Sequence, residues 1–180
     1  MGLPKLSFFF VQLAAYTSDY AEIRDAQMVA LLLPLTGFGV AIDIGDPTSP
    51  EGDIHPRRKQ EVGRRLALSA QKVQYKMQGV VSEGPTFEGV QYVQPTKASA
   101  VATATVSFRA DTAAGLHMHG SAACKACCAE SPLELQTADG NWVRTGAMTV
   151  AGATVTASAA TTQKVTGIRF DWEGYPQCAL

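Results

Sequence analysis

Two short apolar runs, separated by a segment with helical spacing, constrain the fold of this chain more than any other feature. Residues 7–14 read SFFFVQLA, and residues 38–45 read FGVAIDIG. Runs of this length are typical of strands that are buried on both faces of a parallel sheet. Two parallel strands need a crossover connection, which is usually a helix. The pattern therefore predicts a βαβ unit at the start of the chain.

The crossover segment carries its own helix signals. Asp19 and Glu22 have the spacing of a capping box, in which each side chain accepts a hydrogen bond from a backbone amide near the other. A helix is expected over residues 20–33, ended by Pro34 and Gly37. Its buried face is expected to hold four apolar residues, Ile23, Ala26, Ala30 and Leu33.

A second helix is expected after the long loop that follows the second apolar run. Pro56 suits a first helical position, and Val62, Leu66 and Ala70 recur on one face of the segment beyond it. Strand, helix, strand and helix in this order predict that residues 1–80 are the C-terminal part of a doubly wound parallel α/β sheet.

The pattern changes near residues 79–89, where glycine and proline interrupt the chain. Alternation of period two dominates beyond that point, as in VATATVSF, GAMTVAGATVTA and VTGIRFDW. In the last of these stretches the alternation puts Ile168, Phe170 and Trp172 on one side of the expected strand, and Arg169 and Asp171 on the other. Residues 81–180 are therefore expected to form a small β-rich C-terminal module.

Charge and hydropathy argue against several kinds of partner. The 15 basic and 16 acidic residues give a net charge of −1, so neither nucleic acid nor a membrane is expected as a partner. The apolar run of residues 6–15 is short and interrupted by Gln12, so we expect no targeting signal and no membrane span. A basic cluster is interpreted as solvated helix surface: Arg57, Arg58, Lys59, Arg64 and Arg65.

The loop after the second apolar run carries the residues best suited to chemistry. Ligands of an open α/β sheet bind beyond the carboxyl ends of its strands. Four polar residues fall there: Asp43, Asp46, Asp53 and His55. Asp53 and His55 can face one site, because side chains two apart in an extended segment point the same way. A carboxylate on Nδ1 of the imidazole leaves Nε2 free to take a proton from a nucleophile. The alternative is that His55 is only a loop residue ahead of a helix start.

Several stretches, in this order, resemble the C-terminal half of sialate O-acetylesterases, which are SGNH hydrolases. They are FFFVQLAAY, AEIRDAQ, GVAIDIGDPTSPEGDIHPRRKQEVGRRLALSAQKVQY, GPTF and IRFDWEGYPQCAL. The DIHP block and the helix after it are the most specific part. The resemblance implies an SGNH-like sheet for residues 1–80. It also implies a serine esterase that removes O-acetyl groups from sialic acids or related carbohydrates, in a lysosomal or secreted location, with no cofactor.

Matching the DIHP block residue by residue makes His55 the expected general base and Asp53 the acid that orients it. The wider group usually has the acid three residues before the histidine, whereas the gap here is two, so Asp46 and Asp43 stay as alternatives. The family's nucleophile lies in an N-terminal Gly-Asp-Ser-like turn, and the 180 residues contain neither Gly-Asp-Ser nor Gly-x-Ser-x-Gly. The missing N-terminal half of the enzyme is therefore an expected partner, and the isolated chain is expected to be inactive.

The stretch HMHGSAACKACC raises a different hypothesis. Thiolate and imidazole are ligands that Zn²⁺ prefers, and the stretch holds five of them: His117, His119, Cys124, Cys127 and Cys128. The spacing matches no zinc finger, so we expect no metal, and disulfides or free thiols are favoured, with Cys178 as a candidate partner. The alternative function is a non-catalytic β module that binds carbohydrate or a structural zinc. Its candidate sugar-stacking residues are Trp142, Trp172 and Tyr175.

Overall fold

The computed structural model describes residues 6–117 and 131–176, which form two compact units. The first unit comprises the described residues up to Gly84 together with Glu173–Pro176, and the second lies within Pro85–Trp172. Five residues of the disulfide and zinc hypotheses lie outside the described residues: His119, Cys124, Cys127, Cys128 and Cys178. Those two hypotheses therefore stay predictions.

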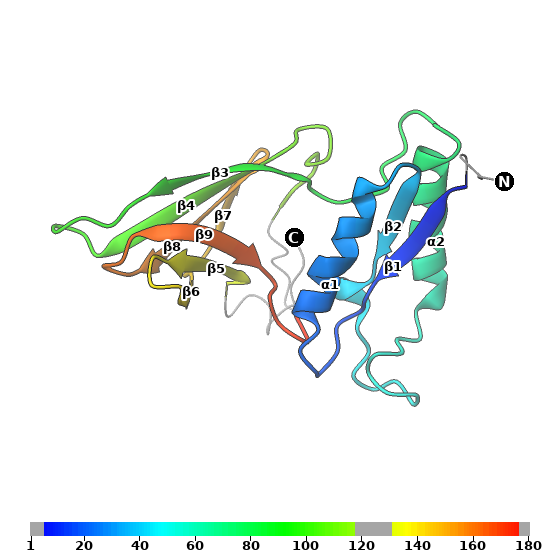
Figure 1. Ribbon diagram of the computed structural model, residues 1–180, viewed down its shortest axis with the longest axis horizontal. Helices are drawn as coiled ribbons and strands as arrows, with labels where there is room; N and C mark the ends of the chain where they lie inside the picture. The colour runs from blue at the N-terminus through cyan, green and yellow to red at the C-terminus, as the bar shows by residue number, and fades with distance from the viewer. Residues whose placement is uncertain (1–5, 118–130, 177–180) are drawn as a thin grey trace. The chain divides into compact units, whose positions relative to one another are not determined.

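The first unit is a parallel strand pair flanked by two helices (Figure 1). Its elements are β1 (Phe8–Gln12), α1 (Ala21–Met28), the 3₁₀ helix η1 (Val29–Leu32), β2 (Thr36–Val40), the 3₁₀ helix η2 (Ile42–Ile44) and α2 (Lys59–Val73). In the parallel register, Phe8 lies opposite Thr36 and Gln12 opposite Val40. The βαβ unit expected from the two apolar runs is confirmed.

The close approach of β2 to α2 depends on two glycines. A Cβ atom on Gly37 would overlap Oγ of Ser69, which is buried, and a Cβ atom on Gly39 would lie 3.3 Å from Cβ of Arg65. Because both positions lack a side chain, the helix can pack directly on the strand backbone. The small buried core beside this contact consists of Ala14, Ala41 and Ile44, with Val11 and Val62 packed against it.

Helix α1 differs from the sequence expectation in its cap and in its buried face. Its N-cap is Tyr20, which makes no side-chain cap, and Asp19 accepts a hydrogen bond from the amide of Ala21 at 3.2 Å. The predicted capping box is therefore wrong. The buried residues are Ala21 and Arg24, whereas Ile23 is 46% exposed. The predicted buried face is wrong, because α1 packs on the rest of the first unit through the side of the helix that carries Arg24 and not through its apolar residues.

The second strand and the second helix also have different bounds from those expected. The strand ends at Val40, and Asp43 lies on η2 instead of on the strand. Helix α2 begins three residues after Pro56, at Lys59, so Pro56 does not occupy the first helical position. Within the described residues, no helix is both long enough and apolar enough to cross a lipid bilayer.

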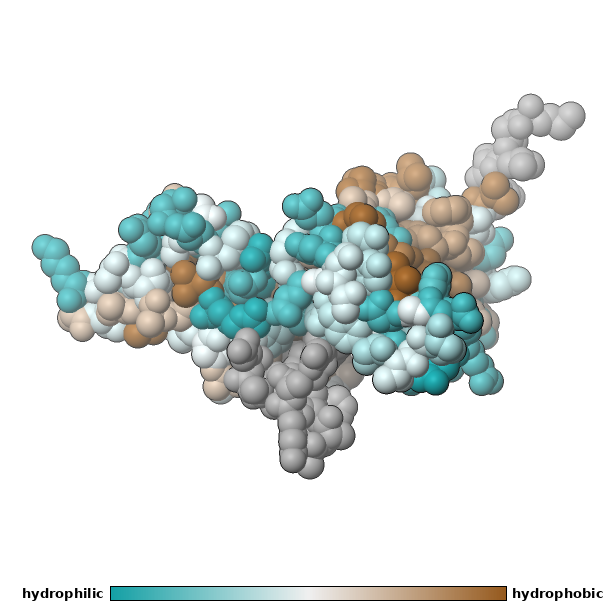
Figure 2. Space-filling view, turned by 90° about the horizontal axis from the view of Figure 1, so that it is seen from below, coloured by the Kyte–Doolittle hydropathy of each residue, from teal (hydrophilic) through white to brown (hydrophobic). Residues whose placement is uncertain are grey.

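The outer edge of β1 carries no strand in the described part of the chain. The strand is apolar except for Gln12, yet none of its residues is fully buried, and Phe8 is 57% exposed. The expectation of a strand buried on both faces is therefore wrong for this structure. Further large apolar side chains of the first unit are exposed, and Figure 2 shows hydrophobic side chains gathered on its surface. They include Leu6, Val29, Leu32 and Leu33.

The side chain of Gln27 on α1 closes the carboxyl end of this free edge. Its Nε2 donates to the carbonyl of Val11, and its Oε1 accepts from the amide of Leu13, both at 3.0 Å. The backbone groups of successive strand residues face opposite sides in turn. Since the amide of Phe8 donates to Leu35 on the β2 side, the backbone groups of Val11 and Leu13 face away from β2. At the carboxyl end of this edge, the side-chain amide of Gln27 thus satisfies the backbone hydrogen-bonding groups, whereas the other end of the edge is exposed.

The second unit consists of two antiparallel sheets. The strand orders are β3-β4-β8-β7 and β6-β5-β9. Their bounds are β3 (Phe87–Val93), β4 (Val101–Phe108), β5 (Leu133–Thr137), β6 (Trp142–Arg144), β7 (Thr149–Ala151), β8 (Thr154–Ala160) and β9 (Val165–Phe170). The sheets pack face to face, because Ala104 on β4 and Leu135 on β5 belong to one buried cluster. The strand expected at VATATVSF is β4 with the same bounds.

The alternation expected at the end of β9 is only partly correct. Ile168 packs on the core as predicted, but Phe170 is 37% exposed, and Asp171 is buried. Asp171 has a φ of 47°, a left-handed conformation that ends the strand and breaks the period of two. At this residue, therefore, the side of the strand expected to be charged and exposed becomes the buried side.

Candidate active site

The loop that follows η2 folds as a series of turns beyond the carboxyl end of β2. The amide of Ser49 donates to the carbonyl of Asp46, that of Gly52 to Ser49, and that of His55 to Gly52, at 3.1, 3.1 and 2.9 Å. The hydroxyl of Ser49 also donates to the carbonyl of His55 at 2.6 Å. These bonds give the loop a defined backbone and fix the position of His55.

His55 presents its ring at the surface of the first unit. The residue is exposed, and within the described part of the chain its imidazole forms no hydrogen bond or ion pair with a carboxylate. A group that approaches from outside can therefore reach this residue.

Asp53 connects the loop to the segment that follows the neighbouring strand. Its Oδ2 accepts a hydrogen bond from the amide of Thr17, which follows β1, at 3.0 Å. The carboxylate is half-buried and takes part in no ion pair among the described residues. The structure thus brings Asp53 and His55 to one loop, without a hydrogen bond between their side chains.

Asp46 is held by Arg57. Nε and Nη2 of Arg57 donate to the two carboxylate oxygens at 2.7 and 3.0 Å. The hydrogen bond from Arg57 is the main reason that the pKa of Asp46 lies well below its usual range. The hydroxyl of Thr48 adds a further hydrogen bond at 3.2 Å. This carboxylate is therefore committed to an ion pair within the loop.

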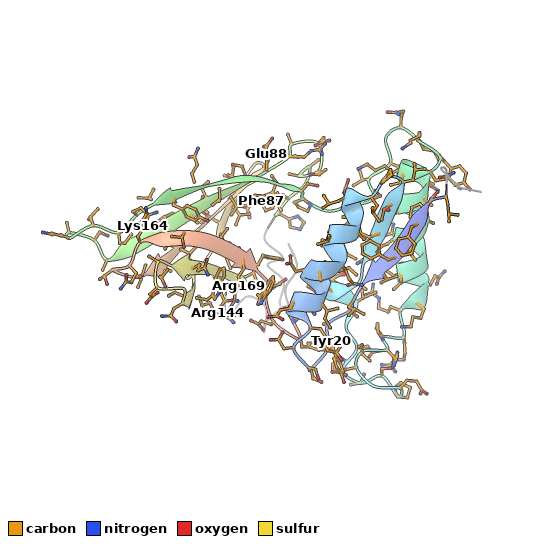
Figure 3. The ribbon with its side chains drawn as sticks, viewed as in Figure 1. Tyr20, Phe87, Glu88, Arg144, Lys164 and Arg169 are labelled. Atoms are coloured by element: carbon orange, nitrogen blue, oxygen red, sulfur yellow. The ribbon has the colours of Figure 1, made fainter. Side chains whose placement is uncertain are left out.

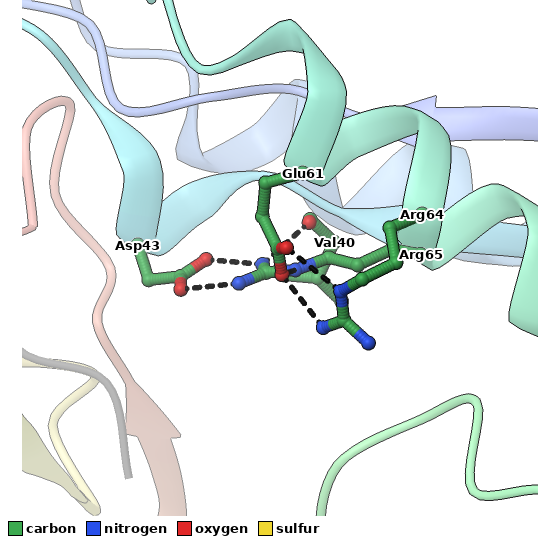
Figure 4. A network of polar contacts seen from close by, with 5 residues as sticks. All are labelled: Val40, Asp43, Glu61, Arg64 and Arg65. Carbon is green, nitrogen blue, oxygen red and sulfur yellow. Dashed lines mark hydrogen bonds and ion pairs between the residues drawn. The ribbon is translucent and has the colours of Figure 1, made fainter.

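Asp43 belongs to a separate network at the start of α2 (Figure 4). Arg65 donates to its two oxygens at 2.5 and 2.8 Å and to the carbonyl of Val40 at 2.8 Å. Burial raises the pKa of Asp43, but the hydrogen bonds and charge of Arg65 outweigh it, so the pKa is lowered. Glu61 completes the network by accepting from Arg64 and Arg65, each at 2.8 Å, which lowers its pKa to about 2.

The two arginine pairs separate the three candidate acids. Asp43 and Asp46 each face a guanidinium in bidentate geometry, whereas Asp53 faces only a backbone amide. Sequence reasoning misses these ion pairs, because the sequence pattern around Arg57 and Arg65 indicates only a solvated surface. The spacing of Glu61 and Arg65, four residues apart on a helix, is a signal that could have identified part of the network.

The two tryptophans of the second unit lie against an arginine. The guanidinium carbon of Arg169 (Figure 3) lies 4.2 Å from the ring centre of Trp142 and 5.7 Å from that of Trp172. Nε of Arg169 also donates to Glu134 at 2.7 Å. This stack occupies one face of Trp142, so it does not favour that face as a sugar platform.

His117 contacts the carbonyl of Gly115 through Nδ1 at 2.7 Å. Among the described residues, no three histidine, cysteine, aspartate or glutamate side chains are grouped so as to hold a metal ion.

Comparison with known proteins identifies two kinds of relative. The chain is 42% identical to mouse sialate O-acetylesterase over 90 residues, which cover 43% of this chain and 17% of the mouse protein. It is 37% identical to the human sialate O-acetylesterase over 75 residues, which cover 42% of this chain and 13% of the human protein. The matched region thus spans less than a fifth of either curated relative.

A solved structure matches nearly the whole chain. It is a carbohydrate acetylesterase from Xanthomonas citri, with a TM-score of 0.74 and 25% identity. The match covers 96% of this chain and 37% of that protein. No protein-family model matches the chain. The resemblance to sialate O-acetylesterases expected from the sequence is thereby confirmed, over somewhat less than half of this chain.

Proposed function

We propose that this chain is the base-bearing part of a carbohydrate O-acetylesterase that acts on O-acetylated sialic acids or related sugars. The observation that carries the proposal is the position of His55 and Asp53 on one loop beyond the carboxyl ends of a parallel strand pair. That arrangement occurs in a chain similar to sialate and carbohydrate acetylesterases. In this proposal the first unit is the C-terminal part of an SGNH-like sheet, and a location in lysosomes or outside the cell remains a prediction.

His55 is the general base of the proposed reaction. Nε2 of the imidazole takes the proton of a serine hydroxyl as the serine oxygen attacks the acetyl carbonyl carbon. The imidazolium then donates this proton to the departing sugar oxygen, which leaves an acetyl-serine. Water then attacks the acetyl carbon while the same imidazole takes its proton, and the imidazolium returns that proton to the serine oxygen as acetate leaves. No cofactor takes part in these steps.

Asp53 is the acid that orients the imidazole, because Asp43 and Asp46 are already neutralised by arginines. Hydrogen bonds of a catalytic site often tighten only in the complex with substrate. The exposed ring of His55 can turn toward Asp53 when the rest of the site is assembled.

The serine comes from polypeptide outside these 180 residues, which contain no Gly-Asp-Ser turn. This polypeptide also supplies a strand that pairs with the free edge of β1. The apolar sequence of β1, its exposed Phe8 and its half-satisfied edge support this part of the proposal. The pairing ends before Val11, because the side-chain amide of Gln27 already bonds to the backbone of Val11 and Leu13.

A fusion tests the proposal directly. The matched 37% of the Xanthomonas citri acetylesterase is replaced by this chain, folding is checked by circular dichroism, and acetate release from acetylated sugars is measured. His55→Ala should lower kcat by about 10³-fold or more, since the base and the later acid are both lost. His117→Ala is the matched control, because it removes another exposed histidine, and it should keep the rate.

Asp53→Asn should lower kcat by about 10²- to 10⁴-fold, as expected for loss of the orienting acid. Asp46→Asn should have a smaller effect, because Asp46 is a partner of Arg57 and Thr48 and not of the imidazole. A folded and active fusion in which His55→Ala keeps full activity would disprove the assigned base. Equal rates for wild type and Asp53→Asn would disprove the assigned acid.

A further inference from the structure

The segment Glu173–Pro176 belongs to the first unit, although it follows the last strand of the second. The amide of Tyr16, just beyond β1, donates to the carbonyl of Gly174 at 2.9 Å. A Cβ atom on Gly174 would lie 2.8 Å from the carbonyl oxygen of Tyr16 and would overlap that of Ser18. Only glycine fits this contact, so the segment lies directly on the backbone that follows β1.

A buried arginine of α1 anchors the same segment. Arg24 is 3% exposed, and its guanidinium donates to the carbonyl of Gly174 at 3.2 Å and to that of Glu173. A buried charge is costly unless it is hydrogen-bonded, so these carbonyls are needed to keep Arg24 inside the unit. Pro176 is buried as well. The four residues therefore have a fixed place in the first unit.

This anchoring sets the ring of Tyr175 against the start of the His55 loop. A Cβ atom on Gly45 would lie 2.8 Å from the phenol oxygen of Tyr175 and 2.9 Å from Cβ of Ala15. The end of the phenol therefore packs on the backbone of Gly45. Burial raises the pKa of Tyr175, and the negative charges of Asp53 and Asp46 raise it further. The hydroxyl thus shares its surroundings with two carboxylates of the loop.

We propose that Tyr175 is a positioning residue of the candidate active site, held by Arg24 and Gly174 so that it fixes the loop carrying Asp53 and His55. The inference rests on the proposed function for the role of His55. The loop is hydrogen-bonded to the segment after β1 through Asp53 and Thr17, and the phenol of Tyr175 adds a second support at the first residue of the loop. A loop held at two points keeps the imidazole in place for proton transfer.

Hydrogen exchange of the 180-residue chain tests the positioning role without any esterase activity. The amides of Ser49, Gly52 and His55 are hydrogen-bonded within the loop, so their exchange reports loop opening. Tyr175→Ala should speed their exchange about tenfold while the amides of α2 keep their rates. Tyr175→Phe, which keeps the ring, should stay within about twofold of wild type. Tyr75→Ala, at an exposed tyrosine of the same unit, is the matched control and should change neither region.

The inference is overturned if Tyr175→Ala leaves the loop amides at their wild-type rates. It is also overturned if all amides of the first unit speed up equally, because that result indicates general loss of stability. In the active fusion, Tyr175→Ala should lower kcat about tenfold to a hundredfold with little change in KM, and Tyr175→Phe should restore it. If the fusion with the wild-type loop is inactive, the proposed function fails, whereas the exchange experiment still decides the role of Tyr175.

Discussion

Gly37 and Gly63 are both glycines of the first unit, but the space around them differs. A Cβ atom on Gly37 would overlap Oγ of Ser69 and lie 2.9 Å from the ring of Phe9. A Cβ atom on Gly63, within α2, would have no atom within 4 Å apart from the nearby backbone of its own helix. Gly37→Ala should therefore destabilise the protein by about 1–3 kcal/mol through overpacking. Gly63→Ala should stabilise it by about 0.5–1 kcal/mol, because alanine is the better helix former.

Urea unfolding followed by circular dichroism at 222 nm measures both changes. Equal destabilisation by the two alanine variants would contradict the packing of α2 on β2. Stabilisation by Gly37→Ala would contradict it more directly.

Glu61 gives a second residue-scale prediction, which concerns acid stability. Its hydrogen bonds with Arg64 and then Arg65 lower its pKa from the ordinary 4.5 to about 2 in the folded state. A lowered folded-state pKa stabilises the protein above the unfolded-state pKa, and this stabilisation is lost as pH falls toward the folded-state value. Stability should thus decline between about pH 4.5 and 2, and Glu61→Gln should flatten the decline.

Thermal melts across this pH range test the role of Glu61. Glu88→Gln is the control, because Glu88 is exposed on β3 and forms no ion pair among the described residues. An unchanged slope for Glu61→Gln would show that the network contributes nothing to acid stability.

At the scale of elements, the sequence predicts strands and their pairing better than it predicts which helix face is buried. The alternation of β4 places Ala102, Ala104 and Val106 in the core, because each strand residue faces one side or the other. In α1 the apolar spacing points to the wrong face, since Arg24 is buried by contacts with carbonyls about 150 residues further along the chain. No local pattern carries that information.

For the loop of the candidate site, the sequence predicts the place in the fold but not the side-chain contacts. Periodicity placed the loop of Asp53 and His55 beyond the carboxyl ends of the strands, and the structure has it there. The pairing of Asp43 with Arg65 and of Asp46 with Arg57 depends on how the loop turns back toward α2. Such turns are set by tertiary hydrogen bonds, so the sequence alone left three acids open.

The free edge of β1 gives a prediction at this scale. An exposed apolar edge strand promotes association, and a charged residue on it opposes association. Phe8→Lys should therefore weaken self-association of the isolated chain by about tenfold in Kd. Phe87→Lys is a matched control, because Phe87 is also 57% exposed, and it should have a smaller effect.

Sedimentation velocity over a concentration series measures this association. In the fusion with the remaining acetylesterase polypeptide, Phe8→Lys should instead lower the stability of the folded protein, since the strand edge is then covered. If the two lysine variants weaken self-association equally, the edge of β1 has no special role in it.

At the scale of the whole molecule, the two units carry different spectroscopic probes. Both tryptophans of the chain, Trp142 and Trp172, lie in the second unit, whereas the α-helices of the described residues, α1 and α2, lie in the first. Tryptophan fluorescence therefore follows the second unit, and the helical signal at 222 nm follows mainly the first. Unfolding of the two units can be separated in one sample.

Gly174→Ala uses this separation to test whether a segment beyond β9 stabilises the first unit. The new methyl group would meet the carbonyl oxygens of Tyr16 and Ser18, which are backbone atoms and cannot move away easily. The helical transition should therefore lose about 1–3 kcal/mol of stability, while the fluorescence transition keeps its midpoint. Gly84→Ala, with no atom within 4 Å of its Cβ position, is the control and should shift neither transition. A shift of the fluorescence midpoint alone would mean that Glu173–Pro176 stabilises the second unit, and the anchoring by Arg24 would then be energetically unimportant.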